Sequence, residues 1–181
     1  HATSDVMLML GRLNQLNRTM TEALNDPKKT GMLHNFTARN AQESGAMVWG
    51  DIAQMAVSLT AAQQLSTFHG IDMYVSSSLG QENMVSTTWH KANQLMMALE
   101  NLEECQVIQL ALAVILIQQK KSLQPALFTV SPVNQAIIQR VMERLEKKGV
   151  THIGVDALPE QTEQLLITCN EILLENNCNR F

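Results

Sequence analysis

Aromatic and charged residues are both scarce in this chain. Phe, Trp and Tyr make up 4% of its 181 residues and Asp, Glu, Lys and Arg 17%, whereas apolar residues reach 45%. An average globular domain is about 25% charged, so we expect a surface that is polar but weakly charged. With 11 methionines and few aromatic rings, the core must use flexible or aliphatic side chains. This composition favours a helical bundle over a β-sandwich.

Cysteine is also rare. Cys105, Cys169 and Cys178 are odd in number and have no CxxC spacing, so the sequence indicates neither a disulfide framework nor a zinc ribbon. We expect reduced, mostly buried thiols. Reduced thiols favour a cytoplasmic location, or secretion of the chain as an effector.

Motifs that would carry chemistry are missing as well. No two of the five histidines lie three to five residues apart, and no HExxH sequence or glycine-rich phosphate loop occurs. We therefore predict no metal, no cofactor and no catalytic residue. The net charge of −4 gives no reason to expect a nucleic-acid partner.

One strongly apolar segment stands out against this polar background. Residues 107–117 read VIQLALAVILI, and so many Leu, Ile and Val side chains must be buried in a water-soluble domain. At about 1.5 Å per residue in a helix, the segment spans only half of a bilayer core, so we predict no transmembrane segment. We interpret it as a buried central helix, with a buried strand as the alternative.

Amphipathic patterns on both sides of this segment predict further helices. Val6, Met9, Leu13, Leu16, Met20 and Ala23 follow one another at steps of three and four residues. Similar stripes run through 48–62 and 85–102. Ser131-Pro132 and Gly149 are typical start and stop signals around a helix whose buried face should hold Val133, Ile137, Val141 and Leu145. Pro159 opens the last predicted helix, with a stripe of Leu165, Leu166, Cys169, Ile172 and Leu173 or Leu174.

These elements together predict a mainly α fold. We expect a single helical domain over 1–181, a multi-helix bundle of about five to seven helices around the buried helix 107–117. The alternative is a subdivision near 122–131. Two short apolar segments, near 126–130 and 150–155, have a strand-like pattern and are consistent with a small β element.

Charge is unevenly distributed in the last third of the chain. Residues 119–148 are mostly basic, and residues 149–181 are acidic. The commonest cause of such a pattern is a pair of adjacent helices with complementary faces.

The sequence contains no set of polar residues with the spacing of a catalytic or ligand-binding site. We therefore favour a non-enzymatic protein–protein interaction module, such as an adaptor, effector or assembly component. It would bind another protein through an apolar or Met-containing helix face, because Met side chains repack against varied partners. The alternatives are a ligand-sensing helical bundle, and a small hydrolase or transferase that uses the 71–90 region. The predicted partner-binding residues are Met73, Tyr74, Met84, Trp89, Arg140 and Arg144.

Overall fold

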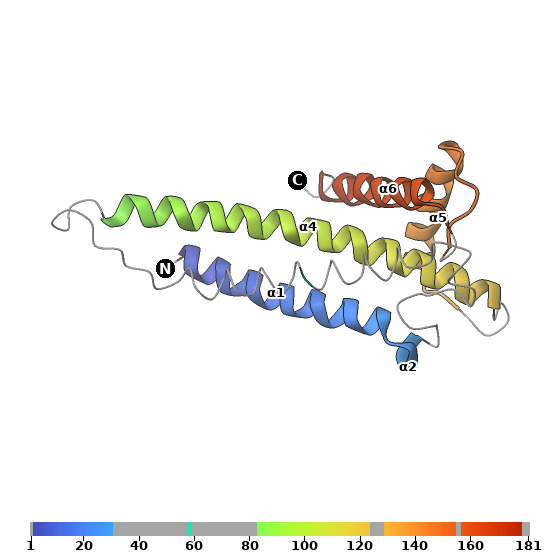
Figure 1. Cartoon of the computed structure of the whole chain (residues 1–181), viewed down its shortest axis with the longest axis horizontal. Coiled ribbons are helices and arrows are strands. Elements are labelled where there is room, and N and C mark those ends of the chain that lie inside the picture. Colours follow the sequence, from blue (N-terminus) through green and yellow to red (C-terminus); the bar gives the residue numbers. More distant parts are fainter. Residues whose placement is uncertain (1, 31–57, 59–82, 124–128, 155–156, 179–181) are drawn as a thin grey trace. The chain divides into compact units, whose positions relative to one another are not determined.

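The chain is mainly α-helical. The computed structural model describes residues 2–30, 58, 83–123, 129–154 and 157–178, and its helices are drawn in Figure 1. They are α1 (Ala2–Asn25), α2 (Pro27–Thr30), α4 (Asn83–Leu123), α5 (Pro132–Lys147) and α6 (Pro159–Cys178), and these described ranges contain no strand. The predicted helix over 48–62, the loop that contains Met73 and Tyr74, and residues 126–128 lie outside the described residues.

The helices belong to two compact units. One unit contains α1 as far as Thr21 and α4 as far as Gln106. The other contains the end of α1, the short helix α2, the rest of α4 from Val107, and both α5 and α6.

Helix α4 is continuous through 41 residues. We predicted one helix over 85–102 and a separate one over 107–117, and that division is wrong. No Gly or Pro occurs between Asn83 and Leu123, so nothing interrupts the helical hydrogen bonds where the glutamates of 100–104 precede the apolar run.

One side of the apolar segment is buried, whereas Val107, Leu110, Leu116 and Ile117 remain partly exposed. Ala111, Leu112, Val114 and Ile115 have no exposed surface, and Ile108 is also buried. Burial of each Leu, Ile or Val side chain contributes roughly 1.5–3 kcal/mol, so this half of α4 supplies a large part of the core of its unit. None of the helices that the structure describes combines the length and the apolarity needed to cross a membrane.

Helix α5 begins and ends at the predicted signals. The backbone N–H of Asn134 donates to the Ser131 hydroxyl at 3.4 Å, and Pro132 occupies the first turn. At the other end Gly149 adopts a φ of 79°, which lets the N–H of Val150 donate back to the carbonyl of Leu145 at 2.9 Å. Val150 thus closes the helix and starts no strand, so the β element expected near 150–155 is wrong over 150–154.

The buried faces of α5 and α6 match the prediction only in part, since Ile137 in α5 and Leu166 in α6 are only half-buried and Leu174 is 47% exposed. Val141 and Leu145 are fully buried, but Ile138 joins them and Val133 is 70% exposed, because it lies in the first turn of α5 beyond the packed part of the helix. In α6 the predicted core residues Leu165, Cys169 and Ile172 are buried. Helices α5 and α6 pack against each other in the second unit.

Candidate functional site

Two features of the described residues are candidates for a functional site. One is a cluster of charged side chains between α5 and α6, and the other is a set of large apolar side chains that lie exposed on α1 and α4.

The α5–α6 charge cluster comprises three basic residues of α5 and its C-terminal end and two acidic residues of α6. The basic residues are four apart, and the acidic residues are also four apart, so each set lies along one face of its helix. The members are Arg140, Arg144, Lys148, Glu171 and Glu175.

Short contacts join these side chains. Nη2 of Arg144 lies 2.6 Å from both carboxylate oxygens of Glu175, and Arg140 donates to the same carboxylate. Nζ of Lys148 lies 2.9 Å from Oε1 of Glu171 and also donates to the Thr168 hydroxyl at 3.3 Å. The basic and acidic stretches therefore form the predicted complementary faces of adjacent helices, which confirms that interpretation of the charge pattern.

Ionisation in the cluster follows from these contacts. The hydrogen bond from Arg144, assisted by the positive charges of Arg144 and Arg140, lowers the pKa of Glu175 against the opposing effect of desolvation. The hydrogen bond to Glu175 in turn raises the pKa of Arg144. Since the Glu175 side chain remains 42% exposed, water screens these pairs and their stabilising effect is modest. The cluster positions α5 against α6 but brings no reactive group to a protected site.

The α1 apolar stripe is the first of the exposed apolar sets. It consists of five residues whose side chains are 43–64% exposed: Val6, Met9, Leu13, Leu16 and Met20. These are the residues that the sequence pattern places on one face of the helix. Complete burial of such a side chain is worth roughly 1.5–3 kcal/mol, so each residue retains about 1 kcal/mol of unrealised burial.

The buried side of α1 is a different one. Leu10, Asn17 and Thr21 are buried, and they lie about a quarter turn around the helix from the stripe. The hydroxyl of Thr21 donates to the carbonyl of Asn17 at 2.9 Å. Helix α1 therefore turns a partly polar side toward its own chain and leaves its most apolar side in solvent.

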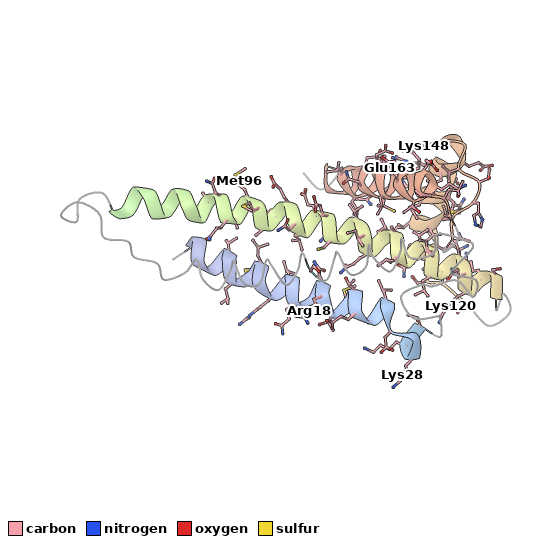
Figure 2. All side chains as sticks on the ribbon, viewed as in Figure 1. Arg18, Lys28, Met96, Lys120, Lys148 and Glu163 are labelled. Carbon is pink, nitrogen blue, oxygen red and sulfur yellow. The ribbon has the colours of Figure 1, made fainter. Side chains whose placement is uncertain are left out.

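The Met96–Met97 surface is the second exposed apolar set. Met96 is 60% and Met97 62% exposed, and Leu99 is also exposed, whereas Ala98 between them is buried. Met96 is labelled on α4 in Figure 2. Two adjacent exposed methionines give this turn of α4 an adaptable apolar contact.

The predicted partner-binding residues belong to different parts of the chain, with Met84 and Trp89 in the first unit and Arg140 and Arg144 in the second. Arg140 and Arg144 contact Glu175 within the chain, while Met84 and Trp89 lie near the start of α4. Met73 and Tyr74, like most of the 71–90 region proposed for hydrolysis, fall outside the described residues. The sequence reasoning did not select the α1 stripe as a site, although its steps of three and four residues were the signal that could have found it.

Chemistry beyond binding has little support in the described ranges. They contain no group of three or more His, Cys, Asp and Glu side chains arranged to hold a metal ion. Burial raises the pKa of the Cys169 thiol to about 12, and burial together with the neighbouring charge of Glu104 raises that of Cys105 to about 11. Neither cysteine forms a disulfide, and at neutral pH these raised pKa values keep both thiols protonated.

Comparisons with family models, with curated proteins and with solved structures found no match to this chain.

Proposed function

We propose that the protein is a non-enzymatic helical interaction module that binds another protein through an exposed, Met-containing helix face. The single observation that carries this proposal is the exposure of Met96 and Met97 together on one turn of α4. An isolated exposed apolar residue is ordinary on a protein surface, but adjacent large ones mark a contact site. Leu99 extends the apolar area by another side chain.

The chemistry of methionine supports binding of a partner protein. The side chain is unbranched and its sulfur is polarisable, so it adapts to contacts of different shape at little conformational strain. The neighbouring Glu100, Glu103 and Glu104 carry negative charge on the same stretch of α4. We expect the partner to present an apolar patch bordered by basic residues.

A particular arrangement of the helices would support this function. We propose that the helices are arranged as a bundle of about five to seven around the buried segment 107–117, which keeps the C-terminal half of α4 rigid. A rigid helix loses little entropy when it binds, so most of the apolar contact energy is available for affinity.

Site-specific photo-crosslinking in cells that make this protein tests the proposal. A photoreactive amino acid at position 97 should yield a discrete adduct with another protein, and the same amino acid at the exposed position Glu163 of α6 should not. The captured protein, once purified, should bind the chain with a Kd that Met97→Asp raises at least about tenfold and Glu163→Gln leaves unchanged. Equal adducts at both positions, or none at position 97, would refute the proposal.

A further inference from the structure

We propose that the exposed face of α4 around Met96 binds a basic amphipathic helix of another protein. The inference rests on the proposed function and names the partner by its chemistry. The face consists of the two exposed methionines and the three exposed glutamates that follow them, and we call it the Met–Glu face. Its members are Met96, Met97, Glu100, Glu103 and Glu104.

The five side chains of the Met–Glu face lie on one side of α4. At 3.6 residues per turn they cover about 120° of the circumference, and at about 1.5 Å per residue they extend about 12 Å along the axis. Ala98 and Cys105, which are 1% and 0% exposed, lie on the opposite side of the helix. The chain therefore packs against the other side of α4, and the Met–Glu face has an apolar end followed by an acidic end one to two turns further along.

The acidic end has no basic partner within its own chain. Its three glutamates are the only charged residues in 92–119. Among the residues that the structure describes, none of the three forms an ion pair, whereas Glu171 and Glu175 of α6 are each paired with a basic side chain. Unpaired negative charge next to exposed apolar side chains is complementary to a segment that carries both apolar and cationic side chains.

The stretch between α2 and α4 does not supply such a segment. Residues 31–82 contain Arg39 as their only Lys or Arg, against the acidic residues Glu43, Asp51, Asp72 and Glu82. A second copy of the Met–Glu face is also unsuitable, because the glutamates of both copies would meet. The same charge repels nucleic acids and anionic membranes. The complementary occupant is therefore a basic segment of another protein.

The backbone of α4 favours a helix as that segment. Peptide groups inside a continuous helix are hydrogen-bonded to one another, so α4 offers no backbone partner to an extended segment. A helix satisfies its own backbone groups and presents the side chains at i, i+3, i+4 and i+7 in one stripe. Large apolar residues in one turn, with Lys or Arg one and two turns away, match the Met–Glu face.

Fluorescence anisotropy with synthetic helical peptides tests the inference on the full chain. The probe is a dye-labelled amphipathic peptide of Leu and Lys at helical spacing, and a matched peptide carries Glu in place of every Lys. The Leu–Lys peptide should bind at least about tenfold more tightly than the Leu–Glu peptide. Replacement of all three glutamates of the face by Gln should raise its Kd about tenfold, since exposed ion pairs contribute roughly two- to fivefold each. High salt should remove that difference.

A control with the same change in net charge separates the Met–Glu face from general attraction. It replaces three exposed glutamates of α5 and α6 and should leave the Kd within about twofold of the wild-type value. Its substitutions are Glu146→Gln, Glu160→Gln and Glu163→Gln. Because every replaced glutamate is exposed, both triple variants should retain the helical circular dichroism of the wild-type chain.

Three results with the peptides would overturn the inference: no binding of the Leu–Lys peptide up to about 1 mM, equal binding of the two peptides, or equal losses in the two triple variants. In cells, the partner segment crosslinked at position 97 should carry Lys or Arg within two helical turns of the attachment point. A captured segment without basic residues would overturn this inference and leave the proposed function standing. No adduct at position 97 would refute both.

Discussion

Arg144 and Glu175 form the central contact between α5 and α6: one guanidinium nitrogen lies 2.6 Å from both oxygens of the carboxylate. The same arginine approaches Glu171 through Nη1 at 3.8 Å, and the same glutamate receives Arg140. The pair therefore links the other members of the α5–α6 charge cluster. Because the pair lies between two packed helices, its removal should lower the stability of the fold more than the removal of any other contact of the cluster.

Replacement of Arg144 by Gln should lower the melting temperature by only a few degrees. The contact is short, but the surroundings are partly exposed and water competes for the charges. The deficit should shrink at high salt, where the ion pairs of the wild-type chain are screened as well. Thermal melts of Arg144→Gln and of the control Glu163→Gln, an exposed glutamate elsewhere on α6, check this. A deficit independent of salt, or an equal deficit in the control, would contradict an electrostatic role.

Stability should decline in acid partly through Glu175. The pKa of this carboxyl is lower in the folded chain than its ordinary value of 4.5. The contribution is complete above that ordinary value and is lost as the pH falls through the lower, folded value. Urea unfolding at a series of pH values should therefore give a shallower acid decline for Glu175→Gln than for the wild-type chain. Parallel declines would mean that the folded chain does not favour ionised Glu175.

Truncation in the apolar segment of α4 should be far more damaging than truncation on its exposed surface. Leu112→Ala removes a fully buried side chain and should cost about 2–5 kcal/mol of unfolding free energy. Met97→Ala, on the same helix but largely exposed, should change it by about 0.5 kcal/mol or less. Denaturant titrations measure both. Similar losses at the two positions would contradict the described burial of α4.

The two described cysteines should resist thiol reagents in the folded chain. With pKa values of about 11 and 12, only about a thousandth or less of either thiol is ionised at pH 8, and both are buried. In a Cys178→Ser background, labelling of Cys105 and Cys169 should be slow in buffer and fast in denaturant. Rapid labelling of either in buffer would show that its environment is open.

The ends of α5 and the start of α6 were predictable because local chemistry sets them. Ser131 and Pro132 before α5, Gly149 after it and Pro159 at α6 each act within a turn of the helix, and the structure has the helices there. The ion pairs were predictable in kind, since blocks of opposite charge followed each other along the chain.

The side that a helix buries was harder to predict. The α1 pattern predicts an amphipathic helix but not what covers its apolar face, because that depends on partners distant in sequence or on another molecule. Val133 fits the spacing of the buried face of α5, yet it lies exposed at the end of the helix. The continuity of α4 was predictable from the absence of Gly and Pro, and the change from a mixed to an apolar composition obscured it.

The labelling rate of a cysteine at position 97 measures whether large apolar side chains of α4 lie in solvent on a single chain. In dilute protein carrying Cys178→Ser, Met97→Cys should react with a maleimide at nearly the rate of a free thiol, since the position is 62% exposed. Ala98→Cys, at the adjacent position that is only 1% exposed, should react orders of magnitude more slowly. Equally slow reaction of both cysteines would mean that the chain covers Met97 itself, and the account would be wrong.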